Sequence, residues 1–407
     1  KDVFFFKKGI SVLTIPYPVW LITIAQALGM LTAPLVIFVG GFLGVLFAPS
    51  ASLATLPVAA LVVGSAVTSM PAAFIMKRIG RRRGFVYATL VAILGSILAV
   101  YSVRGENFLG LCFSIFLLGG HMAFVQQFRF AAIEWVPADK VAMTASVVML
   151  GGLFAAWFGP EIAMLGKDLF TQTFSGSFVL LALCHVVLLV LLSVMPFASI
   201  PAVDESAVVK RSWLSLLLQP GISAAIASAA VAFGVMSLIM TATPVSMSEI
   251  QNYPLDDTKT VIQSHIMAMF LPSLFEPFLF RIFSLLRMLL AGLVVMSAAV
   301  SIAILDQGYW GYWSALVCLG VGWNFLFVAG TTLLTQQYTK QDSFTVQAMN
   351  DAAVFSTQAV MALCAGWMVF NFGWLALNLL SVPLLILALL LIARWYFSSL
   401  THKKAAN

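Results

Sequence analysis

Long apolar stretches follow one another along almost the whole chain, separated by short polar segments. A membrane-spanning helix needs roughly 20 consecutive apolar residues. Six such stretches precede the polar segment PAVDESAVVKRS (201–212), and six follow it. The predicted spans are residues 17–46, 54–76, 84–103, 108–133, 141–163, 174–196, 213–243, 259–280, 283–304, 309–336, 343–370 and 373–396. The pattern therefore predicts an all-α membrane protein with 12 transmembrane helices in two pseudo-symmetric six-helix bundles.

The two halves of the chain resemble each other at an offset of about 200 residues. LLGGHMAF (117–124) lies where CLGVGWNF (318–325) falls in the second half, and a polar turn follows each of them. Internal duplication of this kind is common in secondary transporters. We therefore predict an N-terminal half over 1–200, a cytoplasmic linker over 201–212 and a C-terminal half over 213–407.

The composition excludes several classes of protein. Hydrophobic residues make up 62% of the chain and charged residues only 9%, whereas about 25% are charged in a soluble domain. The four cysteines lie in apolar runs without the spacing of a disulfide framework or a zinc site. No GxxxxGK[ST], HExxH or GxSxG motif occurs. The sequence predicts no enzyme, no cofactor and no bound metal, and it does not predict ATP-driven transport within this chain.

The basic residues are distributed unevenly between the two ends of the predicted spans. If the N-terminus is cytoplasmic, most of the 21 Lys and Arg residues fall on cytoplasmic flanks. The other side then carries only Arg104, Lys167 and Lys259, and Arg129 lies within a span. By the positive-inside rule, both termini are cytoplasmic and the number of spans is even. The net charge of +6 thus reflects topology, and no nucleic-acid partner is needed to explain it.

A short basic turn, KRIGRRRG (77–84), connects the second and third predicted spans. This turn resembles the signature loop of the major facilitator superfamily, and FRIFSLLR (280–287) is a weaker echo of it in the second half. The resemblance covers the whole chain. It implies a monomeric permease of the bacterial inner membrane that works by alternating access. The predicted gating residues are Arg78, Gly80, Arg81, Arg82, Glu134, Glu276 and Arg281.

The chain also departs from the family pattern. The family loop usually carries an aspartate just before its first arginine, and Lys77 stands there in this sequence. The fourth span has Ile115 and Phe116 where proton-linked members often carry an arginine. The usual charge relay of the gate and the usual proton chemistry therefore cannot be copied to this chain.

Ionisable side chains within spans are costly and mostly functional. Asp351 lies about 16 Å along the eleventh span, at 1.5 Å per residue from Lys340. It is the first candidate for proton or substrate binding, and the alternative is an acid held by Asn350 or Gln347 for helix packing. Arg129 suits a carboxylate or phosphate on a substrate. Its alternatives are snorkelling to the interface or pairing with Glu134.

Several uncharged polar groups within spans complete the list of candidate binding residues. His121 lies in the fourth span and is a candidate for lining the cavity, with core packing as its alternative. Amide side chains in lipid need partners, which either a ligand or a neighbouring helix can supply. The amide candidates are Gln26, Gln126, Asn324, Gln347 and Asn350. The ten tryptophans and 33 phenylalanines carry little weight, because membrane interfaces and lipid-facing surfaces absorb most aromatic residues.

The sequence thus predicts a secondary active transporter that moves a small organic solute by alternating access, coupled to protons. Arg129 favours an anionic metabolite, a vitamin or a siderophore, whereas Asp351 would equally suit a cation. A drug or metabolite efflux pump and a lipid flippase are alternatives with the same fold. The expected partners are a small-molecule substrate, protons and membrane lipids.

Overall fold

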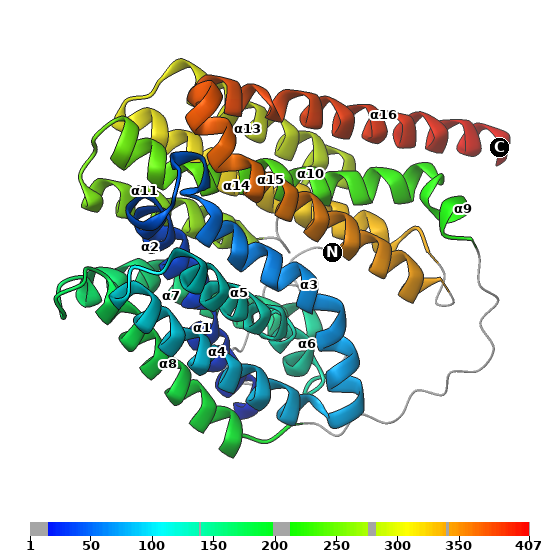
Figure 1. The fold of residues 1–407 in the computed structure, drawn as a ribbon. Coiled ribbons are helices and arrows are strands. Elements are labelled where there is room, and N and C mark those ends of the chain that lie inside the picture. Colours follow the sequence, from blue (N-terminus) through cyan, green and yellow to red (C-terminus); the bar gives the residue numbers. More distant parts are fainter. Residues whose placement is uncertain (1–14, 138–139, 198–211, 276–281, 339–341, 407) are drawn as a thin grey trace, which may run out of the picture.

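The computed structural model describes residues 15–137, 140–197, 212–275, 282–338 and 342–406, and within these ranges the chain is helical without any strand. The N-terminal half, drawn from blue to green in Figure 1, contains α1 (Tyr17–Met30), α2 (Thr32–Phe47), η3 (Ala51–Leu53), α3 (Leu56–Ile79), α4 (Arg81–Arg104), α5 (Phe108–Val125), α6 (Phe128–Ile133), α7 (Val141–Gly166) and α8 (Ser175–Val194). Most of the predicted linker lies outside the described residues, so the boundary between the halves stays a prediction.

The C-terminal half, drawn from green to red, lies beside the first (Figure 1). It contains α9 (Trp213–Leu217), α10 (Pro220–Val245), η5 (Ser246–Ile250), α11 (Leu255–Phe270), η6 (Leu271–Leu274), α13 (Leu285–Leu305), α14 (Tyr309–Thr335), α15 (Ser343–Leu379) and α16 (Ser381–Ala406).

The helices correspond to the predicted spans. Ten segments of the described chain are long and apolar enough to cross a membrane. One of them, Thr345–Thr401, covers most of α15 and most of α16. Gly373 interrupts it with a φ of 81° at the predicted junction of the last two spans. The remaining predicted span begins with α11, which is 16 residues long. The all-α fold of two six-helix bundles is therefore confirmed.

The same helix contacts recur in both halves. α4 packs on α5 and α8 in the first half, as α13 packs on α14 and α16 in the second. The crossing of α3 with α5 has its counterpart in the crossing of α11 with α14. Glycine allows both crossings to be close, because a Cβ on Gly119 would lie 2.0 Å from Leu61 O and one on Gly320 would lie 2.6 Å from His265 O. The sequence repeat thus marks two equivalent backbone contacts.

Three spans differ locally from continuous helices. The first breaks at Leu31, between α1 and α2, and the fourth breaks at Gln126 and Gln127, between α5 and α6. The seventh span carries Pro244 inside α10, and this proline does not break the helix. There α10 continues and then widens into the π-helical turn η5.

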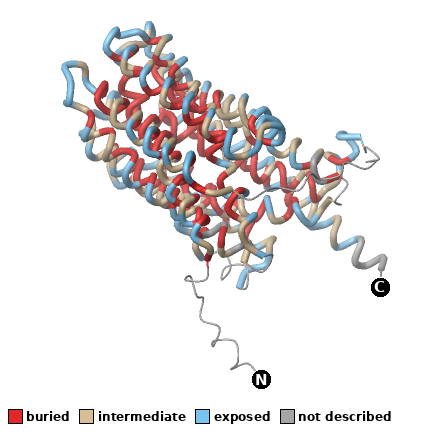
Figure 2. The backbone as a smooth tube through the Cα atoms, turned by 90° about the horizontal axis from the view of Figure 1, so that it is seen from below, coloured by how far each residue is buried: buried red, intermediate tan, exposed pale blue. Residues whose placement is uncertain are grey.

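Buried residues occupy the middle of each bundle, and exposed residues cover the outside and the helix ends (Figure 2). Many exposed side chains are large and apolar, including Leu94, Val190, Val294 and Leu390. In a soluble protein such a surface would associate, whereas lipid acyl chains cover it in a membrane. We call the end with Gly80 and Lys140 the basic end, and the end with Lys259 the opposite end.

Candidate substrate and gating site

Arg129 and Asp351 belong to different halves and are near enough for their charges to interact. Arg129 belongs to α6 and Asp351 to α15, and their charges interact electrostatically. Both side chains are accessible to solvent although protein surrounds them on most sides. Asp351 lies eight residues into α15, about 12 Å along the helix. The pair is therefore a water-accessible charge pair inside the membrane-spanning region.

Three predicted amide residues border this pair. Asn350 Nδ2 donates to Asp351 Oδ1 at 3.2 Å. Gln347, one turn earlier on α15, is exposed and donates through Nε2 to Tyr338 OH at 2.7 Å. Gln126 is exposed at the break between α5 and α6. We name Gln126, Arg129, Gln347, Asn350 and Asp351 the central polar group, and their roles in binding remain predictions.

His121 packs inside the N-terminal bundle against a second histidine. Its ring centroid lies 5.0 Å from that of His185 in an edge-to-face arrangement, and His121 is only 2% exposed. Ser96 Oγ donates to Ala92 O at 2.9 Å, so it accepts from His185 Nδ1 at 3.2 Å. His185 Nε2 then accepts from Thr32 Oγ1 at 3.0 Å. This cluster fastens α2, α4, α5 and α8 together.

Gln26 and Asn324 are buried and serve contacts within their own halves. Gln26 Nε2 lies 2.8 Å from Met30 Sδ, one turn further along the same span. Asn324 Nδ2 donates to Met269 O at 2.8 Å and to Ser273 Oγ at 2.7 Å, which ties α14 to α11 and η6. Neighbouring helical segments, and not a ligand, thus accept the hydrogen bonds that the side-chain amide of Asn324 donates.

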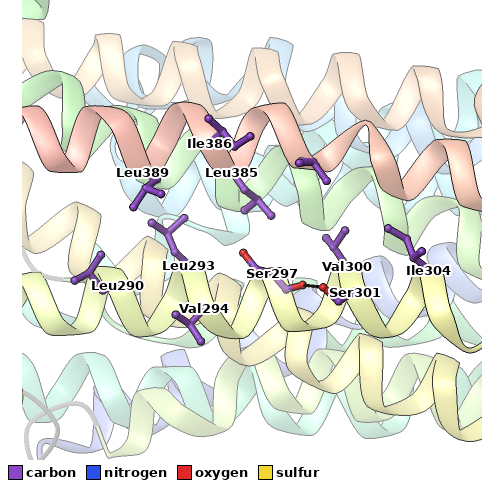
Figure 3. A pocket seen from close by; sticks show the side chains of 11 residues that line it. Leu290, Leu293, Val294, Ser297, Val300, Ser301, Ile304, Leu385, Ile386 and Leu389 are labelled. Carbon is purple, nitrogen blue, oxygen red and sulfur yellow. Dashed lines mark hydrogen bonds between the residues drawn. The ribbon is translucent and has the colours of Figure 1, made fainter.

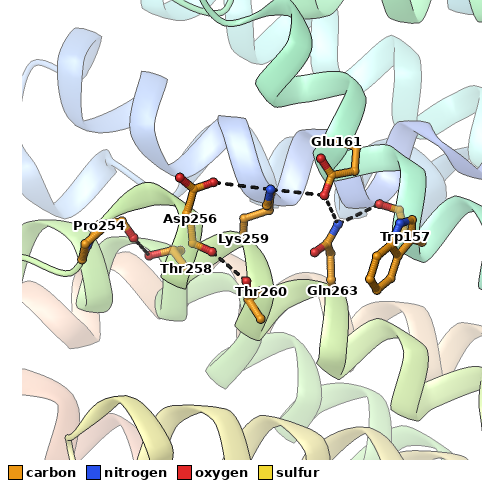
Figure 4. A network of polar contacts seen from close by, with 8 residues as sticks. All are labelled: Trp157, Glu161, Pro254, Asp256, Thr258, Lys259, Thr260 and Gln263. Carbon is orange, nitrogen blue, oxygen red and sulfur yellow. Dashed lines mark hydrogen bonds and ion pairs between the residues drawn. The ribbon is translucent and has the colours of Figure 1, made fainter.

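A polar network at the opposite end joins the two halves (Figure 4). Lys259 Nζ of α11 lies 3.2 Å from Glu161 Oε1 of α7 and 3.4 Å from Asp256 Oδ1. Gln263 Nε2 donates to Trp157 O at 2.8 Å and to Glu161 Oε1 at 3.1 Å. We call this set the opposite-end latch. No motif in the sequence marks this latch, although Lys259 is one of few basic residues predicted on that side.

Backbone packing closes the opposite end further. A Cβ on Gly366 of α15 would lie 2.3 Å from Thr55 Oγ1 and 3.0 Å from Ser52 O in the other half. A Cβ on Gly41 of α2 would lie 3.2 Å from Pro244 Cβ of α10. The two halves are therefore in tight contact at this end.

The predicted gating residues at the basic end make contacts within one half. Glu134 accepts two hydrogen bonds from Arg81 Nε, at 2.9 and 3.1 Å, and one from an outer guanidinium nitrogen at 2.5 Å. Arg82 donates to Ser193 O. Gly80 ends α3 with a φ of 84°, a backbone conformation that suits glycine. Glu134 thus pairs with Arg81 and not with Arg129, the partner that the sequence suggests.

For the three other predicted gating positions, the structure gives no contact that bears on gating among the described residues. Arg78 is exposed near the end of α3. Glu276 and Arg281 lie outside the described residues. The gating roles of all seven positions therefore stay predictions.

A groove of about 460 Å³ runs between α13 and α16 on the outside of the C-terminal bundle (Figure 3). Its lining consists of Leu290, Leu293, Val294, Ser297, Val300, Ser301, Ile304, Val382, Leu385, Ile386 and Leu389. Ser301 Oγ donates to Ser297 O at 2.9 Å, so that hydroxyl is already satisfied. The groove has no charged group, and no residue of the central polar group lines it, so we do not assign it to the substrate.

Comparison with known proteins identifies the family. The Major Facilitator Superfamily matches residues 12–345. This chain is a member of the major facilitator superfamily. The resemblance inferred from KRIGRRRG is thereby confirmed, and the protein is a membrane transporter.

Curated relatives of this transporter align along most of its length. The riboflavin transporter RfnT of Brucella anthropi is 32% identical over 91% of this chain and 93% of the relative. The uncharacterized MFS-type transporter YddS of Bacillus subtilis is 26% identical over 90% of this chain and 88% of the relative.

Solved structures share the fold at low sequence identity. A bacterial homolog of the human lysosomal transporter Spinster, inward-facing and unoccupied, superimposes with a TM-score of 0.67 and 14% identity, covering 95% of this chain and 97% of that one. The POT family transporter PepTSo gives 0.69 and 11%, with coverage of 96% and 99%. FucP in its outward conformation gives 0.59 and 14%, with coverage of 92% and 98%.

Proposed function

We propose that this transporter moves riboflavin, or a vitamin with a similar planar ring system, by alternating access coupled to protons. The observation that carries the mechanism is the electrostatic interaction between Arg129 in one half and Asp351 in the other. A charge pair across the boundary must separate or rearrange when the halves move, so substrate and proton binding there can be linked to the conformational change. The relative RfnT supports the choice of riboflavin.

Asp351 is the proposed proton-binding group. Its carboxylate has Arg129 as the opposite charge and Asn350 Nδ2 as a hydrogen-bond donor. Substrate groups that occupy Arg129 would remove this compensation and favour protonation of Asp351. The direction of flux then follows the proton gradient.

The latch and the glycine contacts close the opposite end, while Arg129 and Asp351 remain accessible to solvent. The positive-inside rule supports placing the basic end in the cytoplasm. We therefore propose that the described conformation opens inward. The proposed setting is the inner membrane of a bacterium, with both termini cytoplasmic and a monomer as the working unit.

The test is counterflow of labelled riboflavin in proteoliposomes that contain the purified chain. We expect exchange in the wild type and accumulation that depends on an imposed pH gradient. In Asp351→Asn, exchange should persist while the response to the gradient disappears. The matched control is Glu249→Gln, an exposed acid at the opposite end of the same half. Absence of riboflavin exchange would refute the substrate, and an unchanged gradient response in Asp351→Asn would refute the coupling.

A further inference from the structure

Three aromatic side chains of the C-terminal half form a corner. Trp323 and Phe327, one turn apart on α14, are stacked with their ring planes 17° apart and their centroids 5.2 Å apart. Phe233 of α10 stands nearly perpendicular to both, at 74° to Trp323 and 82° to Phe327, with centroids 5.0 and 5.2 Å away. We name these three residues the aromatic corner.

The aromatic corner lies next to the helix that carries the central polar group. Phe233 and Phe327 are only partly buried, and they pack with Ala353 and Val354 of α15. These two residues follow Asp351 by two and three positions. Two partly buried aromatic side chains, on α10 and α14, therefore pack on the turn of α15 that follows the proposed proton-binding carboxylate.

The indole of Trp323 carries an unused hydrogen-bond donor. The residue is 5% exposed, and its Nε1 has no hydrogen-bond partner among the described residues. Buried tryptophan N–H groups normally find a partner, because leaving one unmade is costly. Two tryptophans in the same bundle do so, since Trp313 Nε1 donates to Ser264 Oγ and Trp374 Nε1 to Ala303 O.

We propose that the aromatic corner binds the planar ring system of a fused heteroaromatic substrate. The ring packs against the partly buried side chains of Phe233 and Phe327. The Trp323 indole, whose Nε1 is buried in the described conformation, turns on binding so that Nε1 donates to a nitrogen or oxygen acceptor of the ring. Stacking and a satisfied indole donor together select planar, nitrogen-rich ligands over flexible sugars or acids. This inference rests on the proposed function and extends it by naming the residues that recognise the ring.

The experiment measures equilibrium binding to the purified full-length chain by calorimetry. The probes are riboflavin, lumichrome, which is the planar ring system without the ribityl chain, and ribitol. We expect the wild type to bind riboflavin and lumichrome but not ribitol. Trp323→Leu and Phe327→Leu should each weaken lumichrome binding about 10- to 100-fold, because a stacked aromatic partner is lost.

Trp323→Phe separates the donor from the stacking surface. It keeps an aromatic ring and removes the N–H, so lumichrome binding should weaken by about 3- to 10-fold. Trp323→Phe changes the side-chain volume less than Trp323→Leu does, so it still tests the role of Trp323 if Trp323→Leu fails to fold. The matched control is Trp135→Phe, whose Nε1 likewise has no partner among the described residues but which belongs to the N-terminal half. We expect that control to bind as the wild type does.

The outcomes distinguish this inference from the proposed function. Lumichrome binding that depends on Trp323, without riboflavin exchange in proteoliposomes, would support the aromatic corner and refute riboflavin as the substrate. Riboflavin exchange by the wild type, together with unchanged lumichrome binding in the Trp323 and Phe327 variants, would support riboflavin as the substrate and refute the aromatic corner as its binding site. A wild type that binds no lumichrome would overturn the inference.

Discussion

Lys259 of the C-terminal half contacts Glu161 of the N-terminal half, with 3.2 Å between Nζ and Oε1. The two side chains are 16% and 36% exposed, respectively. Because the pair joins α11 to α7 at the closed end, its energy contributes only while that end remains closed. A conformation-specific contact of this kind shifts the equilibrium between closed and open states by its own free energy.

Glu161→Gln should loosen the opposite end. A partly exposed ion pair contributes up to about 1 kcal/mol, so the open population should rise by up to about fivefold. The measurement is the maleimide labelling rate of T55C, whose position is buried against Gly366 in the closed state. Asp256→Asn is the control, since the side chain of Asp256 is 74% exposed. Equal labelling rates of T55C with Glu161 intact and with Glu161→Gln would contradict the prediction.

The Arg129 and Asp351 charges should be coupled energetically. Removing either charge leaves the other uncompensated within the membrane-spanning region, whereas removing both does not. In a cycle of Arg129→Gln, Asp351→Asn and the double variant, we expect a coupling free energy of about 1 kcal/mol or more. Thermal unfolding in detergent measures it, and Arg287→Gln, at an exposed position near the start of α13, controls for loss of positive charge. Additive effects would show that the two charges act independently.

Thr32→Val should destabilise the N-terminal bundle through His185. The variant removes the donor to His185 Nε2 while nearly preserving volume, and an unsatisfied buried acceptor costs about 1–3 kcal/mol. Thr32→Ser retains the hydroxyl and should restore most of the loss in thermal unfolding. If both variants unfold at the wild-type temperature, the histidine cluster does not depend on that hydrogen bond.

Glu134→Gln should lower stability without opening the opposite end. The Arg81–Glu134 pair ties α4 to the end of α6 within one half, and a bidentate pair that is largely shielded contributes about 1 kcal/mol. We expect a small drop in unfolding temperature and an unchanged T55C labelling rate. Arg83→Gln, at an exposed position beside Arg81, is the control. A changed labelling rate would instead make Glu134 part of the inter-half gate.

The spans and the repeat of the fold could be predicted from the sequence because the bilayer dictates the length and polarity of each helix. Apolar length predicted the spans, and the repeat between residues 117–124 and 318–325 anticipated the equivalent crossings at Gly119 and Gly320. Local deviations were not accessible. Nothing in the pattern distinguished the break at Gln126 from the continuous helix through Pro244, because neighbouring helices decide whether a backbone carbonyl is satisfied.

The sequence predicted only part of the candidate site. Asp351 and Arg129 could be singled out as costly charges in a span, but their relationship could not be derived, since they lie 222 positions apart in the numbering. A polar side chain in the fourth span made His121 a candidate for lining the cavity, and only the tertiary packing reveals that it contacts His185. The latch and the aromatic corner consist of ordinary residues at unremarkable spacings.

The sequence by itself thus determined the membrane setting, the number of spans and the family, because these depend on apolar length, charge asymmetry and one short motif. Tertiary structure alone decided how the polar groups are placed. Arg129 and Asp351 interact electrostatically, Lys259 contacts Glu161, and Trp323 Nε1 has no partner among the described residues. The physical reason is that hydrophobic burial depends on each residue separately, whereas pairing depends on how the two halves dock.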